Sequence, residues 1–489
     1  MTPTELVLQH YRLPFDLRQF QIEDTNTLSV LPRSGLYLEP GLGKTAVSTC
    51  CALYKLIIGE ASRVMVIMPP LLIAQWARWL NSIEAIDGSK FKILRYEGDV
   101  KHRAKLSFDA DFILLGIQIF KIDKERILKE ANDLDIFVIL DEAQCVKDVG
   151  SGNYQAYRHY IETQYVSDDA VFNALLEPEN CKKHQLLTGT PLNFPEDSYA
   201  YIKLVTPHIY RNLLHFHNEH VVSFDVRNKP EEYKNLDVLK ANLVLNASRR
   251  TKEEVLSELP ECVVGEIEYE LDSKHYALYK ELADSKMLLL PGGDKIDATN
   301  ASALYYALGQ IVCQWSHFGR NEKLKAKIYS LIEEVLGELG DKKLIVFSNF
   351  RRTNEEVVRR FGFPGIWGEI PDKEKARGLA KFLDDPKCRG IAMHPSSGGV
   401  GVDGFQHVCT DILYTEPPVT PAHWVQSLSR VHRSGQAKSV TVRMGVAKGT
   451  IQRHLINRLS EKEALVNPVQ GSESYLTREQ VRKIVFGLE

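Results

Sequence analysis

The stretch Gly35-Leu-Tyr-Leu-Glu-Pro-Gly-Leu-Gly-Lys-Thr45 decides the fold. Its first residues form a short apolar run that predicts a buried strand, and a helical pattern follows from Ala46 to Leu56. A glycine-rich turn between a strand and a helix that ends in Lys-Thr is typical of a phosphate loop of the Walker A type. Gly41 and Gly43 allow backbone N–H groups to turn toward phosphate oxygens, and the helix N-terminus adds its dipole.

This loop predicts a site for ATP and Mg²⁺. We expect Lys44 to reach the β- and γ-phosphates and the Thr45 hydroxyl to hold Mg²⁺. Leu38 stands where the motif usually has its first glycine. The alternative is a glycine-rich turn without a ligand. The residues of the loop predicted to bind the nucleotide are Gly41, Leu42, Gly43, Lys44 and Thr45.

A second apolar run, Ile136-Phe-Val-Ile-Leu-Asp-Glu-Ala-Gln144, ends in two acidic residues. We expect Asp141 to bind Mg²⁺ through its water shell and Glu142 to polarise the attacking water. Adjacent acidic residues are common at strand ends, so this pair alone would indicate little. Because it follows the phosphate loop by about a hundred residues, the two signals together favour ATP hydrolysis.

Similar short apolar runs recur along the chain with helical patterns between them, which predicts an α/β protein with parallel sheets covered on both faces. The predicted strands are Gly35–Glu39, Arg63–Met68, Phe112–Gly116, Ile136–Asp141, Gln185–Thr188, Lys343–Ser348, Gly390–His394, Asp411–Thr415 and Val440–Met444. We therefore predict two α/β units: lobe 1 at 1–245 and lobe 2 at 246–465, each with a helical insertion, and a tail at 466–489. The insertion in lobe 2 is expected at about 273–339.

Composition narrows the class further. Of 489 residues, 44% are hydrophobic and 26% charged, which is ordinary globular usage and excludes a largely disordered chain. No apolar run approaches the roughly 18 residues of a membrane span, and the first fifteen residues lack a secretory signal, so we expect a cytoplasmic protein. The net charge is −3, yet the segment from Gln426 to the end of the sequence contains eleven Lys and Arg residues and only five Asp and Glu residues. That local excess is either a solvated surface or a patch that contacts phosphates.

The order of these and further motifs resembles the Swi/Snf-type branch of the superfamily-2 helicase-fold ATPases. The matching segments are Leu17–Gln21 (adenine motif), Leu38–Thr45 (I), Met68–Trp76 (Ia), Asp141–Asp148 (II, here a DEAQ box), Leu187–Asn193 (III), Arg249–Val255 (typical of the branch), Leu344–Phe350 (IV), Ser397–Asp403 (V) and Gln426–Gln436 (VI). The resemblance runs from about Leu17 to about Thr450, nearly the whole chain.

The resemblance implies two RecA-like lobes that hydrolyse ATP together. It places Gln21 at the adenine base, Asp403 at the ribose hydroxyl, and Gln144 between nucleotide and lobe contacts. It also places Gly401 among the nucleotide-binding residues. Arg430 and Arg433 would be arginine fingers that stabilise the transition state when the lobes close. The alternatives are a solvated helix face for the two arginines and a structural strand-end role for Asp403.

The resemblance also implies contact with the phosphates of double-stranded DNA, including branched or forked DNA. The residues in the corresponding positions are Pro69, Gly116, Thr188, Ser348, Ser396 and Ser397. Small residues and helix N-termini suit phosphate contacts, which carry no sequence information. Gln144, Asp403 and Ser427 depart from the family pattern, and the tryptophan of its W-N-P motif is missing, with Trp424 three residues after Pro421.

We therefore expect an ATP-dependent DNA translocase that remodels DNA or protein–DNA complexes. The alternatives are a fork-remodelling or annealing helicase of the same branch, a DEAH-like RNA helicase, and an ATP-gated DNA-binding scaffold. The chain contains little beyond the motor, so we expect a monomer of phage or bacterial origin whose specificity comes from a partner protein.

Overall fold

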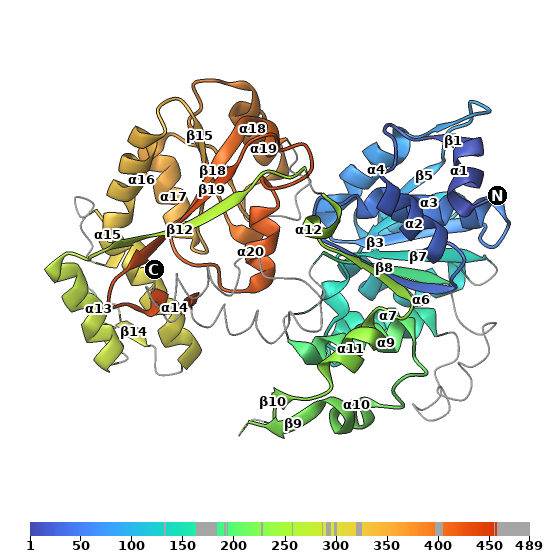
Figure 1. Ribbon diagram of the computed structural model, residues 1–489, viewed down its shortest axis with the longest axis horizontal. Helices are drawn as coiled ribbons and strands as arrows, with labels where there is room; N and C mark the ends of the chain where they lie inside the picture. The colour runs from blue at the N-terminus through green and yellow to red at the C-terminus, as the bar shows by residue number, and fades with distance from the viewer. Residues whose placement is uncertain are drawn as a thin grey trace. The chain divides into compact units, whose positions relative to one another are not determined.

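The computed structural model describes residues 1–131, 134–162, 183–189, 192, 194–225, 228–256, 258–285, 287–289, 295–297, 301–318, 325–396, 404–453 and 455–456. The chain divides into two compact units, and the main segment of the first spans Met1–Ser257 (Figure 1). No helix in these described ranges is long and apolar enough to cross a membrane.

The first unit is built on a seven-stranded sheet with the order β11-β2-β8-β7-β3-β6-β5, in which every neighbouring pair is parallel. Its central strands are buried along their whole length, which explains their continuous apolar sequences. The strands of this unit are β1 (Tyr11–Arg12), β2 (Arg33–Leu38), β3 (Arg63–Met68), β4 (Glu84–Ala85), β5 (Ile93–Tyr96), β6 (Phe112–Gly116), β7 (Ile136–Asp141), β8 (His184–Leu187), β9 (Val221–Phe224), β10 (Pro230–Tyr233) and β11 (Ala247–Arg250).

Helices cover both faces of this sheet, with α1–α4 on one side and α6, α7 and α9 on the other (Figure 1). The α-helices are α1 (Pro3–His10), α2 (Gln19–Leu28), α3 (Lys44–Ile57), α4 (Ile73–Asn81), α5 (Val100–Arg103), α6 (Ile117–Glu130), α7 (Gly152–Ile161), α9 (Ser198–Val205), α10 (Leu213–His220), α11 (Leu236–Leu243) and α12 (Lys252–Val255). Short 3-10 turns cover Pro70–Leu72, Ala143–Val146 and Pro195–Asp197.

The second unit contains a six-stranded parallel sheet with the order β12-β19-β18-β15-β17-β16. Its strands and hairpin are β12 (Cys262–Tyr269), β13 (Met287–Leu289), β14 (Lys295–Asp297), β15 (Lys343–Phe347), β16 (Gly365–Ile366), β17 (Gly390–Met393), β18 (Cys409–Tyr414) and β19 (Val440–Ala447). Its helices are α13 (Ser273–Ser285), α14 (Ala301–Cys313), α15 (Trp315–Phe318), α16 (Lys327–Glu338), α17 (Arg351–Phe361), α18 (Asp372–Asp384), α19 (Phe405–Val408) and α20 (Pro421–Leu428). Thus α13–α16 fall within the insertion predicted at 273–339.

The predicted α/β class is confirmed, and all nine predicted strands are strands of these two sheets. The unit boundary differs from the predicted 245/246, because β11 pairs with β2 and adds the segment after residue 246 to the first sheet. The sequence Ala-Ser-Arg-Arg of β11 has no apolar run, which is why the strand was not predicted.

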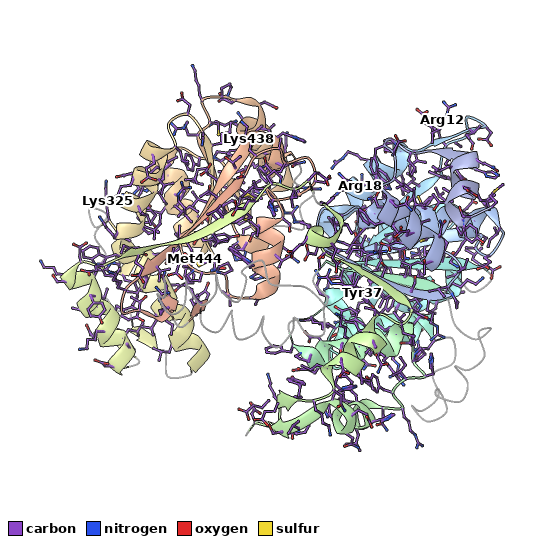
Figure 2. The ribbon with its side chains drawn as sticks, viewed as in Figure 1. Arg12, Arg18, Tyr37, Lys325, Lys438 and Met444 are labelled. Atoms are coloured by element: carbon purple, nitrogen blue, oxygen red, sulfur yellow. The ribbon has the colours of Figure 1, made fainter. Side chains whose placement is uncertain are left out.

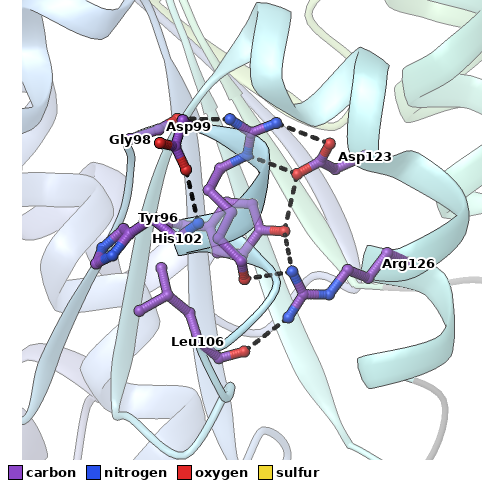
Figure 3. Close-up of polar contacts among 8 residues, drawn as sticks. Tyr96, Gly98, Asp99, His102, Leu106, Asp123 and Arg126 are labelled. Carbon is purple, nitrogen blue, oxygen red and sulfur yellow. Dashed lines mark hydrogen bonds and ion pairs between the residues drawn. The ribbon is translucent and has the colours of Figure 1, made fainter.

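A polar cluster anchors the segment between β5 and α6 (Figure 3). The guanidinium of Arg103 donates to both oxygens of Asp123, at 2.7 and 3.0 Å, and the Tyr96 hydroxyl donates to the same carboxylate at 2.9 Å. Arg126 donates to the Leu106 carbonyl oxygen at 2.9 Å. The hydrogen bonds from Arg103 hold the pKa of Asp123 below its usual range. The cluster is therefore a structural ion pair that fixes the edge of the sheet.

Candidate nucleotide site and nucleic-acid contacts

Three loops meet at one edge of the first sheet. The strands β2, β8 and β7 are neighbours and run parallel, so their carboxyl ends lie together. The loops that follow contain the phosphate loop, Thr188 and the acidic pair. The carboxyl edge of a parallel sheet is the usual position of a ligand site in α/β proteins.

The phosphate loop has the backbone geometry that its glycines allow. Gly41 and Gly43 have φ values of 94° and 82°, and Gly43 caps the N-terminus of α3. The ammonium group of Lys44 donates to the Leu38 carbonyl oxygen at 2.9 Å. Burial lowers the pKa of Lys44, whereas the carboxylates of Glu142 and Asp141 act in the opposite direction. The ammonium group of Lys44 therefore lies close enough to the acidic pair to interact with it electrostatically.

Gln21, predicted to read the adenine base, supports the loop from α2. Its buried amide donates to the Leu42 carbonyl oxygen at 3.0 Å and accepts the N–H of Arg18 at 2.8 Å. A Cβ atom on Gly43 would lie 2.3 Å from Gln21 Nε2, so a larger residue at this position would displace the Gln21 amide. The structure thus shows Gln21 as a brace of the loop, and base recognition stays a prediction.

The acidic pair occupies the end of β7. Asp141 is buried, and its Oδ2 accepts the indole N–H of Trp76 at 2.8 Å. Burial raises the pKa of Asp141, and the neighbouring charge of Glu142 adds to the effect. A cation at this position would keep the carboxylate ionised. Mg²⁺ is commonly held by one or two carboxylates together with phosphate oxygens, so Asp141 and the Thr45 hydroxyl form a suitable donor set.

Glu142 adopts a left-handed conformation, with φ 55° and ψ 51°, which is unusual for a residue with a side chain. A chain of hydrogen bonds then links it to the next strand. Thr188 Oγ1 donates to Gln144 Oε1 at 2.8 Å, and Gln144 Nε2 donates to the carboxylate of Glu142. The glutamine of the DEAQ box therefore orients the predicted base.

The chain of hydrogen bonds changes the interpretation of Thr188. It was predicted to contact DNA, but its side chain is fully buried. Such burial argues against a direct phosphate contact. The next residue, Gly189, packs on the phosphate loop, since a Cβ there would lie 2.8 Å from Pro40.

Glu39 is a site-adjacent residue that the motifs did not identify. It is buried just before the phosphate loop, and its carboxylate accepts the backbone N–H of Lys252 at 3.0 Å and lies 3.8 Å from Arg249 Nη2. Arg249 also donates to the Tyr37 carbonyl oxygen at 2.8 Å. The branch-typical segment therefore holds the strand that leads into the loop. The sequence signal that could have identified Glu39 is its position as a charged residue at the end of a buried apolar run.

In the second unit, the predicted arginine fingers follow α20. Arg430 and Arg433 are half-buried in a turn whose ends are anchored to the sheet. Gln436 Nε2 donates to the Cys409 carbonyl oxygen at 3.2 Å, and the His432 ring contacts the Pro260 carbonyl oxygen at 2.8 Å. The turn is thus fixed on its own unit. The predicted residues Gly401, Asp403 and Ser397 lie outside the described residues.

The other predicted DNA contacts differ in accessibility. Pro69 is half-buried, and a Cβ on Gly116 would lie 3.0 Å from Pro70, which brings these two segments together. Ser396 is exposed, and its N–H donates to His394 Nδ1 at 3.1 Å. Ser348 is buried and donates to Glu416 at 2.9 Å, which argues against a phosphate contact by its hydroxyl.

Trp424, the tryptophan nearest to the position of the missing W-N-P tryptophan, is not available at the surface. Its side chain is fully buried and packs on Tyr414, with ring centroids 5.3 Å apart. It is a core residue of the second unit.

Comparisons with known proteins agree with the family resemblance that the order of the motifs suggested. The family model described as the SNF2-related domain matches residues 167–316. An uncharacterized ATP-dependent helicase of Bacillus subtilis, YqhH, is 22% identical over 91% of this chain and 77% of its own length. The mouse DNA annealing helicase and endonuclease ZRANB3 is 24% identical over 87% of this chain and 38% of its own length.

One solved structure, the Sulfolobus solfataricus SWI2/SNF2 ATPase core in complex with dsDNA, aligns with 98% of this chain and 99% of its own, at 19% identity and a TM-score of 0.42. The fold of this chain contains two parallel sheets, one in each unit. The sequence matches confirm the predicted resemblance to Swi/Snf-type superfamily-2 ATPases. This chain spans well under half of the mouse relative.

Proposed function

We propose that the chain is an ATP-driven translocase on double-stranded DNA that remodels DNA or protein–DNA complexes. The observation that carries the proposal is the convergence of Lys44, the acidic pair and the Thr188–Gln144 chain of hydrogen bonds at one sheet edge. Its relatives include proteins named ATP-dependent helicases, which supports ATP as the nucleotide.

The chemistry follows from the side chains. The phosphate-loop amides and Lys44 bind the phosphates. Thr45 and Asp141 would hold Mg²⁺, which would supply positive charge to neutralise the phosphates. Glu142, oriented by Gln144, accepts a proton from the attacking water. Arg430 and Arg433 of the second unit would supply positive charge that stabilises the transition state. Hydrolysis would then require both units.

A second candidate is an annealing or fork-remodelling motor of the same branch. It is favoured by the name of the mouse relative, a DNA annealing helicase. Both candidates hydrolyse ATP at the same residues, so they differ only in the DNA product. The distinguishing experiment uses a plasmid with an unwound region that is coated with a single-strand-binding protein. Gel electrophoresis then measures whether the two strands of that region are annealed.

The dependence on the second unit gives a direct test. Arg433→Ala should reduce turnover by about 10³-fold or more, the usual effect of losing an arginine finger, while nucleotide affinity stays nearly unchanged. Lys438→Ala is the matched control, because it removes an exposed positive charge from the loop after motif VI (Figure 2). Equal phosphate release by Arg433→Ala and the wild type would reject the proposed two-unit mechanism.

A further inference from the structure

A tryptophan outside the predicted site residues contacts the proposed metal ligand. Trp76 lies on α4, is 1% exposed, and its indole N–H donates to Asp141 Oδ2 at 2.8 Å. The other oxygen, Asp141 Oδ1, accepts the backbone N–H of Glu142 at 2.9 Å. Two donors from different parts of the unit therefore fix the plane of this carboxylate.

The contact does more than fill space. A buried indole N–H needs a hydrogen-bond partner, and here the partner is a carboxylate oxygen of Asp141. Because Mg²⁺ requires ligands in near-ideal octahedral geometry, Trp76 acts on a property of Asp141 that metal binding requires, the orientation of its carboxylate.

We propose that Trp76 is a positioning residue that holds the Asp141 carboxylate in the orientation needed to bind Mg²⁺ with the nucleotide. The proposal rests on the proposed function, in which Asp141 is the Mg²⁺ ligand. Residues that hydrogen-bond to metal ligands orient those ligands, and their loss typically reduces metal affinity or activity about 10- to 100-fold.

The same helix supplies a matched control. Trp79 lies one turn further along α4, and its indole N–H donates to the Thr49 hydroxyl at 3.0 Å instead of to a carboxylate. Trp76→Phe and Trp79→Phe therefore remove the same donor and a similar ring volume from one helix. They differ in the lost partner, Asp141 or Thr49, and Trp79 is the less buried of the two side chains.

The test is equilibrium binding of a fluorescent, non-hydrolysable ATP analogue to the full-length protein without DNA, measured by anisotropy across a Mg²⁺ titration. Trp76→Phe should raise the Mg²⁺ concentration for half-maximal binding about 10- to 100-fold. Its affinity for the analogue in EDTA should stay within about twofold of the wild type, since the phosphate loop is intact. Trp79→Phe should match the wild type in both measurements.

A second substitution guards against a folding defect. Incorporation of β-(3-benzothienyl)alanine at position 76 keeps the bicyclic ring and replaces its N–H by sulfur, so packing is preserved while the donor is lost. It should shift the Mg²⁺ titration in the same direction as Trp76→Phe.

A wild-type Mg²⁺ titration for the benzothienyl variant would overturn the positioning role. An equal loss of affinity with and without Mg²⁺ in that variant would overturn it too, because it would indicate a packing effect. In both cases the proposed function stands, since the wild type still binds the nucleotide with Mg²⁺. If the wild type binds the analogue without any dependence on Mg²⁺, both proposals fail.

Discussion

Gly43→Ala is predicted to weaken nucleotide binding through two separable effects. The residue has φ 82°, and an alanine held in the left-handed region costs roughly 1–2 kcal/mol. The new Cβ would also lie 2.3 Å from Gln21 Nε2, so the Gln21 amide must move and lose its bond to Leu42. Loss of that bond costs about 0.5–1.5 kcal/mol.

The two effects add to about 1.5–3.5 kcal/mol. The loop can avoid this strain by leaving its observed conformation, and nucleotide binding must then restore that conformation. The cost therefore appears as lost affinity, about 10- to 300-fold at 1.4 kcal/mol per factor of ten. Anisotropy of a fluorescent, non-hydrolysable ATP analogue measures it, and circular dichroism checks that each variant is folded.

Two further variants separate strain from collision. Gly59→Ala is the control, because Gly59 has φ 73° and a Cβ there meets nothing within 4 Å. It should leave nucleotide affinity within about twofold of the wild type, because the strain lies outside the loop. In a Gln21→Ala background the collision is absent, so Gly43→Ala should weaken binding only about 5- to 30-fold. Wild-type affinity for Gly43→Ala, or an unchanged effect in the Gln21→Ala background, would refute this reasoning.

Three other predictions concern the base, its support and the sheet edge. Glu142→Gln should bind ATP but lose about 10²- to 10⁴-fold in phosphate release, and wild-type turnover would exclude it as the base. Thr188→Val removes the hydroxyl that donates to Gln144, so turnover should fall about 2- to 12-fold with nucleotide affinity retained. A loss of nucleotide affinity without a loss of turnover would contradict the proposed role of the Thr188–Gln144–Glu142 hydrogen bonds. Asp123 has a lowered pKa in the fold, so its stabilising effect is present above its unfolded pKa of about 3.9 and is lost as pH falls through the lower native value. The difference in melting temperature between wild type and Asp123→Asn should therefore shrink below about pH 4, and a constant difference would contradict the ion pair with Arg103.

Much of the fold was predictable because parallel strands buried on both faces need continuous apolar sequences. The strands that escaped prediction lack that property. β11 carries two arginines, and β12 alternates between half-buried and exposed residues at the edge of its sheet. The local sequence of a polar segment does not indicate whether it will pair with the edge of a sheet.

The site was partly predictable for a related reason. Residues at the carboxyl ends of parallel strands come together, so the proximity of Lys44 to the acidic pair followed from the motif order. The contact between Trp76 and Asp141 could not be predicted from the motif order. It joins a helix to a strand 65 residues away, and no repeating sequence pattern marks such a contact. Burial of small strand-end residues such as Thr188 and Ser348 depends on the packing around them, which a motif does not specify.

The most direct test of duplex-dependent ATP hydrolysis is the rate of phosphate release with duplex DNA, forked DNA, single-stranded DNA and single-stranded RNA of matched length. Glu142→Gln serves as the blank for contaminating ATPases. We expect duplex and forked DNA to stimulate release most, and the stimulation to weaken steeply with added salt, because phosphate contacts dominate. If single-stranded RNA is the strongest activator, a DEAH-like RNA helicase becomes the better assignment; if no nucleic acid stimulates release above the Glu142→Gln blank, the chain is not a nucleic-acid-driven motor.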